Sequence, residues 1–124
     1  MMSALPPVID PLDKQQALAG LWHPALLGMV NSTAIKLARI QGEFVWHSHE
    51  HEDEMFLVVQ GRLRLEFRDG ARVLEAGQFL IVPRGVEHRP VAEKECLILL
   101  IEPLETVNTG NTESELRRDG VLPI

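Results

Sequence analysis

Hydrophobic and polar positions alternate along the middle of the chain, as they do in β-strands with one buried face. The alternation is clearest at residues 62–68, where leucine and phenylalanine are separated by arginine and glutamate. The Asp69-Gly70 pair that follows is typical of a tight hairpin turn. Short apolar segments bounded by glycine, proline and charged residues predict further strands at 26–30, 34–40, 42–47, 55–60, 72–74, 78–82, 87–91 and 96–102.

The spacing of these segments predicts an all-β fold. Many short strands joined by glycine and proline turns are typical of β-sandwiches and β-barrels. Periodicity alone does not separate these architectures. Because no segment is repeated along the chain, a single domain is expected.

The two ends of the chain lack the alternation. Asp10 and Pro11 suit the cap and first turn of a helix, and they predict a short helix that runs to about Ala19 and stops at Gly20. Residues 106–120 are rich in polar side chains and predict a tail that packs on the same domain. The chain is therefore divided into an N-terminal arm and helix (1–31), a β-barrel (32–105) and a C-terminal tail (106–124).

Composition indicates a globular protein of ordinary type. A chain of 124 residues fits one domain, and 45% hydrophobic residues are typical of a soluble protein. Cys96 is the only cysteine, so no internal disulfide can form, which is consistent with a reducing compartment. The first 14 residues do not resemble a secretory signal, and the apolar runs are far shorter than the about 20 residues that cross a bilayer. We therefore predict a cytoplasmic protein without a membrane partner.

The charge balance argues against nucleic-acid binding. The formal net charge is −6 at pH 7, and the sequence has no basic cluster beyond Arg117-Arg118. Affinity for nucleic acids comes largely from lysine and arginine contacts with phosphates. We therefore predict no nucleic-acid partner.

Side chains that can bind a metal are concentrated in one short stretch. His47 and His49 are two positions apart, so on a strand they point to the same side. Glu54 follows at the start of the next apolar segment, and His88 follows a turn at residues 83–85. Imidazole and carboxylate groups together suit divalent transition metals.

The stretches around these residues resemble the two motifs of the cupin superfamily, in its small single-domain form of the cupin 2 type. The first motif is matched, with one residue fewer than usual before its first histidine, by Gly42, His47, His49, Glu54 and Gly61. The second motif is matched by Gly77, Pro83, Gly85 and His88. Ala92 stands where many members have asparagine. An H-x-H pattern alone is a weak signal, whereas two motifs in order with a short spacer are a specific one.

The resemblance implies a double-stranded β-helix, or jelly-roll barrel, that binds one divalent transition metal: Fe, Mn, Ni, Cu, Co or Zn. The implied metal ligands are His47, His49, Glu54 and His88. Three imidazoles and one carboxylate leave a coordination position open, which suits catalysis better than a closed structural site does. The alternative is a degenerate cupin that keeps these residues but binds no metal.

Parity along the strands predicts the surroundings of the metal. Val45 is two positions before His47, and Phe56 and Val58 are two and four positions after Glu54. Side chains an even number of positions apart on a strand point to the same side, so we expect all three to line the pocket. We expect His51 at the rim or against a ligand residue, and not on the metal. The neighbouring acidic residues either strengthen the negative potential there or form a solvated loop. A mostly apolar pocket favours a small organic ligand with a metal-binding end.

These features predict a metal-dependent enzyme that acts on a small organic molecule. A dioxygenase, and hence an oxidoreductase, is the preferred hypothesis within that class, and an isomerase is a further candidate. No catalytic residue can be named beyond the metal ligands. A non-catalytic module that binds or senses a small ligand is the main alternative, and a storage role is a third. The resemblance also implies a homodimer, in which the apolar arm and strand edges would be covered.

Overall fold

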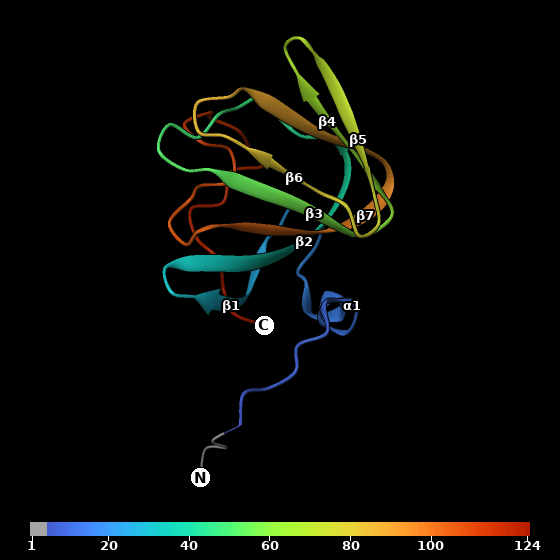
Figure 1. The fold of residues 1–124 in the computed structure, drawn as a ribbon, viewed down its shortest axis with the longest axis vertical. Coiled ribbons are helices and arrows are strands. Elements are labelled where there is room, and N and C mark those ends of the chain that lie inside the picture. Colours follow the sequence, from blue (N-terminus) through green and yellow to red (C-terminus); the bar gives the residue numbers. More distant parts are fainter. Residues whose placement is uncertain (1–4) are drawn as a thin grey trace.

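The computed structural model describes residues 5–124, so the first four residues of the predicted arm lie outside the described residues. Within this part of the chain, antiparallel strands form one seven-stranded sheet that curls into a barrel (Figure 1). The predicted all-β jelly-roll fold with a short N-terminal helix is thereby confirmed. No helix in the described part is long and apolar enough to cross a membrane. The strands are β1 (Ala25–Val30), β2 (Thr33–Glu43), β3 (Glu54–Gln60), β4 (Arg62–Phe67), β5 (Gly70–Glu75), β6 (Phe79–Val82) and β7 (His88–Pro103).

The long strand β7 organises the sheet. It pairs with β2 along most of its length, from Pro103 opposite Thr33 to Val91 opposite Glu43. Its second half also pairs with β3, and its first residues pair with β4. The strand order is therefore β1-β2-β7-β3-β6, with the β4–β5 hairpin attached to the start of β7.

The charged residues 93–95 do not interrupt the sheet, although two separate strands were predicted at 87–91 and 96–102. These three residues are exposed and bulge out opposite Gln41, and pairing with β2 resumes on both sides of them. A bulge of this kind adds residues to one strand without ending it. Both predicted segments therefore belong to β7.

The segment after β2 is irregular, although the alternation predicted a strand that reached His47. The Phe44 N–H donates to the Pro90 carbonyl at 2.9 Å, but Pro90 has no N–H with which to donate in return. The regular ladder therefore stops there. Pairing reappears only as a single bridge between His47 and His88.

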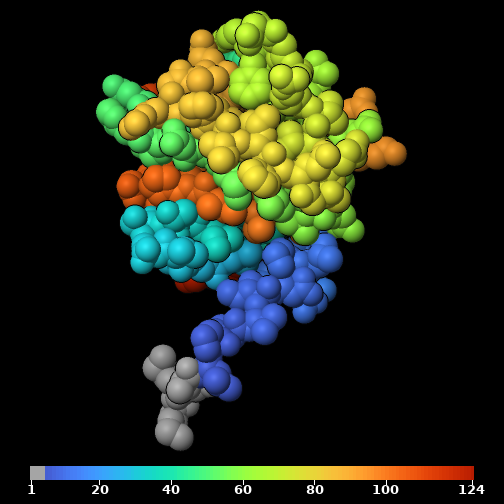
Figure 2. Space-filling model, in the orientation of Figure 1, coloured from blue at the N-terminus to red at the C-terminus, as the bar shows by residue number. Residues whose placement is uncertain are grey.

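The N-terminal helix is shorter than predicted. It consists of α1 (Pro11–Lys14) and a 3₁₀ turn at Gln15–Ala17, whereas a helix up to Ala19 was expected. The Asp10 side chain caps α1 and accepts the Leu12 N–H at 3.0 Å. Because α1 buries none of its residues, packing adds little to a helix far below the about 12 residues that are marginally stable alone. Figure 2 shows the described residues before α1 extending away from the barrel.

Even-numbered residues of β2, β3 and β7 point into the barrel, as expected for side chains that alternate across a sheet. Together with residues of β4 they form the core, which includes Ala38, Ile40, Phe56, Val58, Leu63, Leu65, Ile98 and Leu100. Toward one end of the barrel the inward face becomes polar. Lys36, Glu54 and Glu102 take the inward positions there on the same three strands. The candidate site lies at this polar end.

The residues after β7 pack against the barrel beside β1. Leu26 exchanges backbone hydrogen bonds with Leu122 at 2.9 Å and Ile124 at 3.1 Å. Nearer the start of the tail, Thr112 Oγ1 donates to the Trp46 carbonyl at 3.2 Å. The division of the chain into three segments stays a prediction; β1, within the first of them, pairs with β2 and is part of the sheet.

Candidate metal centre

Four side chains meet inside the polar end of the barrel. His47 and His49 lie in the segment between β2 and β3, Glu54 begins β3, and His88 begins β7. One potential ligand atom from each lies within 4.8 Å of the others. All four residues are buried, with at most 4% of their surface exposed. The structure thus brings together the four residues that the sequence indicated, in a cluster that could hold a metal ion.

Backbone carbonyls fix the orientation of two imidazoles in the cluster. His47 Nδ1 lies 2.9 Å from the Val45 carbonyl oxygen, and His88 Nδ1 lies 2.9 Å from the Val86 carbonyl oxygen. Since a carbonyl only accepts hydrogen bonds, each Nδ1 carries the hydrogen and the Nε2 of the neutral ring keeps its lone pair. The two backbones are also tied to each other, by N–H to carbonyl bonds of 3.1 and 2.9 Å between His47 and His88.

The neutral form of His88 thereby directs an acceptor at Glu54, and His49 approaches the same carboxylate. His88 Nε2 lies 3.1 Å from Glu54 Oε1, and His49 Nε2 lies 3.3 Å from the same oxygen. Both ring nitrogens of His49 are buried and make no hydrogen bond within the described chain. An imidazole lone pair that faces a carboxylate is repelled unless a proton or a cation lies between them. The cluster therefore fits a divalent transition metal, because imidazole and carboxylate groups are suitable ligands for one.

The protonation states at the cluster also suit a metal. Burial, and next the electrostatic interaction with His88, lower the pKa of His47 to about 4, so its ring is neutral at pH 7. Burial alone would raise the pKa of Glu54, but interactions with Glu102, His49 and His88 outweigh it and hold this pKa below its ordinary value. Neutral imidazole and ionised carboxylate are the forms that bind metals.

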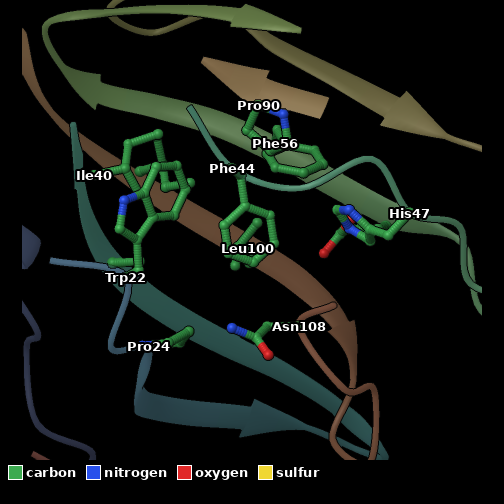
Figure 3. Close-up of a pocket in the computed structure, with 12 residues that line it drawn as sticks. Trp22, Pro24, Ile40, Phe44, His47, Phe56, Pro90, Leu100 and Asn108 are labelled. Atoms are coloured by element: carbon green, nitrogen blue, oxygen red, sulfur yellow. The ribbon is translucent and has the colours of Figure 1, made fainter. Parts of the chain in front are cut away.

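An apolar cavity opens beside the cluster (Figure 3). His47 and Glu54 form its polar side, and Trp22 and Phe44, whose rings stack with centroids 4.7 Å apart, line its apolar part. Asn108 reaches the cavity from the C-terminal tail. The other lining residues are Pro24, Ala38, Ile40, Phe56, Pro90, Ile98 and Leu100. Its apolar lining is of the kind that contacts the apolar body of a small ligand, but the cavity volume is about 30 Å³, so side chains would have to move to admit one.

Of the three residues expected to line the pocket, the structure places one at the cavity and two away from it. Phe56 lines the cavity, whereas Val58 lies farther along β3 in the core, fully buried and away from the cavity. Val45 is half-buried and does not line the cavity either; Phe44 does. The parity argument does not hold for Val45, because the segment after β2 is not a strand.

His51 lies apart from the cluster, at the rim of the barrel. Its side chain is 80% exposed, and its Nε2 lies 3.8 Å from a carboxylate oxygen of Glu50, which is itself 72% exposed. Asp53 has a structural contact instead, since its Oδ1 accepts the Arg84 N–H at 2.9 Å and so ties this loop to the turn before His88. A contact between His51 and a ligand residue stays a prediction.

Sequence reasoning missed most of the residues that line the cavity, among them Trp22, Phe44 and Asn108. Trp22 has a left-handed backbone, with φ 61°, and its Nε1–H donates to the Gln41 carbonyl at 3.1 Å. An aromatic residue in an otherwise unpatterned linker could have indicated Trp22. Asn108 is placed by the path of the tail, for which the local sequence has no signal.

A small antiparallel β-barrel with three imidazoles and one carboxylate gathered in its interior defines the class of protein, a jelly roll whose interior could hold a metal ion. The particular family follows from comparison with known proteins. The sequence model of the Cupin domain matches residues 37–102, and the chain belongs to this family.

Known proteins similar to this chain include a bacterial relative and two solved structures. The chain is 36% identical over 74 residues to YdbB of Bacillus subtilis (strain 168), and the match spans 59% of this chain and 66% of that protein. A crystal structure of a cupin-2 domain containing protein from Shewanella frigidimarina NCIMB 400 is 43% identical, with a TM-score of 0.76 over 77% of this chain and 94% of that one. Hydroquinone 1,2-dioxygenase PnpCD, solved with Cd²⁺ and 4-hydroxybenzonitrile, is 19% identical, with a TM-score of 0.66 over 76% of this chain and 71% of that one, which shows a shared fold. The predicted resemblance to a small cupin is thus confirmed.

Proposed function

We propose that the protein is a metal-dependent enzyme that acts on a small organic molecule. The observation that supports this most directly is the convergence of four buried side chains that can bind a metal, with one potential ligand atom from each within 4.8 Å of the others. His47, His49, Glu54 and His88 would hold one divalent transition metal: Fe, Mn, Ni, Cu, Co or Zn.

A metal bound there would supply a Lewis acid or an oxygen-activating centre. The residues of the chain would position it and the substrate: the Val45 and Val86 carbonyls hold the rings of His47 and His88, and aromatic side chains around the cavity exclude water. Among the described residues, no lysine or arginine lines the cavity. A substrate with several anionic groups would therefore lack partners. We propose a substrate with an apolar body and one metal-binding oxygen or nitrogen atom.

Within this class we favour a dioxygenase. The aromatic side chains beside the cluster are of the kind that contacts a flat ring with a metal-binding oxygen, and such a ring would enter once these side chains move apart; hydroquinone 1,2-dioxygenase shares the fold. The alternative is a module that binds or senses a small molecule without catalysis. One observation favours it: within the described chain, His47 and Glu54 are the only titratable side chains that line the cavity. Both are assigned to the metal, so neither is left for acid–base catalysis.

Metal content tests the site. We expect the purified protein to carry about one transition metal per chain and His49→Ala to carry far less, because a buried ligand has been removed. His51→Ala is the matched control, since it removes an imidazole from the same loop that is exposed and outside the cluster. It should keep the wild-type content. Equal metal content in all three proteins, or equal loss in both variants, would contradict the assignment.

Turnover separates the two functions. We expect the metal-loaded protein to consume dioxygen with at least one member of a panel of small phenols and hydroquinones, and His49→Ala to be inactive. Binding of a panel member without dioxygen uptake or chemical change would favour the binding module.

A further inference from the structure

Three charged side chains stand in a row at the cluster, on the inward faces of adjacent strands. Lys36 lies on β2, Glu102 on β7 and Glu54 on β3. The β2–β7 register makes Lys36 the diagonal neighbour of Glu102. On the other side, the β3–β7 register ends with Met55 opposite Ile101, and Glu54 and Glu102 are the next residues beyond that pair. Glu102 therefore lies between a buried cation and a carboxylate of the candidate metal centre.

Lys36 fixes one end of the Glu102 carboxyl. Its Nζ lies 2.7 Å from Glu102 Oε2 and also donates to the Thr106 carbonyl at 3.2 Å. Lys36 and Glu102 are each only 2% exposed. Glu102 Oε1 is buried without a hydrogen bond to any donor of the described chain. Burial, and next the neighbouring charge of Glu54, raise the pKa of Glu102 well above its usual value. One oxygen of Glu102 is thus held by Lys36, and the other has no partner within the described chain.

Stability alone does not explain a buried ion pair at this position. Burial of two charges costs desolvation energy that their attraction often fails to recover, and apolar residues of similar volume commonly replace such pairs without loss. The next inward positions on the same strands are indeed apolar, namely Ala38 on β2 and Leu100 on β7. The pair occurs where the inward face meets Glu54, which indicates a role at the site.

We propose that Lys36 and Glu102 form a positioning pair for Glu54, an inference that rests on the proposed metal site. Lys36 fixes the Glu102 carboxyl, and Glu102 limits the rotation of the Glu54 carboxyl, so that Oε1 stays directed at His49 and His88. Without the pair, Glu54 would adopt orientations in which neither oxygen faces both imidazoles. Loss of such a partner behind a ligating group typically lowers metal affinity by about 10–100-fold.

Glu102→Asp tests the proposal, because it keeps the carboxyl but withdraws it from Glu54 by one methylene. The matched control is Leu63→Val, which removes one methylene from another fully buried core residue that does not line the cavity. Three quantities would be measured: Co²⁺ affinity by competition with a chromophoric chelator, the visible spectrum of bound Co²⁺, and the melting temperature without metal. We expect Glu102→Asp to lose about 10–100-fold in Co²⁺ affinity and to show an altered spectrum. Leu63→Val should keep both at the wild-type values.

A second variant keeps the proposal testable if Glu102→Asp does not fold. Lys36→Met combined with Glu102→Met replaces the pair by apolar side chains, a change that buried ion pairs tolerate, and the same loss of affinity is expected. Wild-type Co²⁺ affinity and spectrum in a folded variant would overturn the positioning role and leave the metal site standing. An equal loss of affinity in Leu63→Val would also overturn it, because any loss of stability would then have the same effect. If the wild-type protein itself does not bind Co²⁺, the metal site fails and this inference fails with it.

Discussion

His47 shows how burial at the cluster affects a single titratable residue. The residue is 4% exposed, and its Nδ1 hydrogen is donated to the Val45 carbonyl. Burial, and next the electrostatic interaction with His88, lower its pKa from 6.5 to about 4. The folded protein therefore keeps this ring neutral over a pH range in which the unfolded chain protonates it.

We expect the metal-free protein to lose stability as the pH falls from neutral to about 4. Between the unfolded pKa of 6.5 and the folded pKa of about 4, the unfolded state binds a proton at this ring and the folded state does not. Stability therefore rises with pH across this window, and His47 accounts for on the order of 3 kcal/mol between its two ends. Urea unfolding of chelator-treated protein at several pH values within the window measures this. His47→Gln should show a flatter profile; an equally steep one would argue against His47 as the titrating group.

At the residue scale, the sequence predicted the cluster better than its surroundings. The spacing of His47 and His49 and the turn before His88 are local features, so the motifs identified these side chains directly. The facing of Val45 depended on a strand that does not form, because Pro90, far along the chain, cannot return a hydrogen bond. No local pattern contains that information.

The C-terminal tail packs against the loop that contains His47 and His49. Gly110 has a φ of 59° and packs against the Ser48 carbonyl so closely that no Cβ fits between them. Ser48 lies between the two motif histidines. The hydrogen bond from Thr112 to the Trp46 carbonyl fixes the tail to the same loop. The composition of the tail predicted that it packs on the barrel, but its docking position depends on contacts with residues more than 60 positions away in the sequence.

We expect Gly110→Ala to destabilise the protein by roughly 1–3 kcal/mol and to reduce its metal content. The added methyl group would push the tail away from Ser48 and allow the neighbouring His49 to move. Gly77→Ala is the matched control: it also has a positive φ, of 85°, but its Cβ would meet no atom within 4 Å. Gly77→Ala should lower the free energy of unfolding through backbone strain but leave the metal content unchanged. Urea unfolding and metal analysis compare the two variants, and identical behaviour would show that the contact with Ser48 does not matter.

The strands were predictable in position but not in extent. Alternation located the segments that became β3 to β6 to within a few residues. It also divided β7 into two predicted strands on either side of the charged residues 93–95. Their bulge follows from the pairing of β7 with β2 on both sides of them. Pairing between distant segments decides such boundaries, and a single sequence does not reveal it.

At the scale of the whole molecule, one face of the barrel exposes apolar side chains. Phe79 and Ile81 on β6 are 59% and 55% exposed, and Val73 on β5 is 49% exposed. Figure 2 shows β5 and β6, in yellow-green and yellow, side by side on this face. Within the described chain β6 pairs only with β3, so its other edge is open. An open strand edge beside exposed apolar residues is typical of an association surface.

We expect this face to form the interface of the homodimer that the family resemblance implies. Light scattering should give twice the chain mass of 13.9 kDa. Combining Phe79→Ser with Ile81→Ser should raise the dissociation constant by about tenfold or more, because truncation of central apolar residues commonly costs more than 1 kcal/mol each. Leu122→Ser is the matched control, since Leu122 is 80% exposed but lies on the tail. A wild-type protein that stays monomeric at every concentration would contradict the homodimer. A dimer that survives the β6 changes but weakens with Leu122→Ser would place the interface at the tail and β1 instead, where the C-terminal residues pair with Leu26.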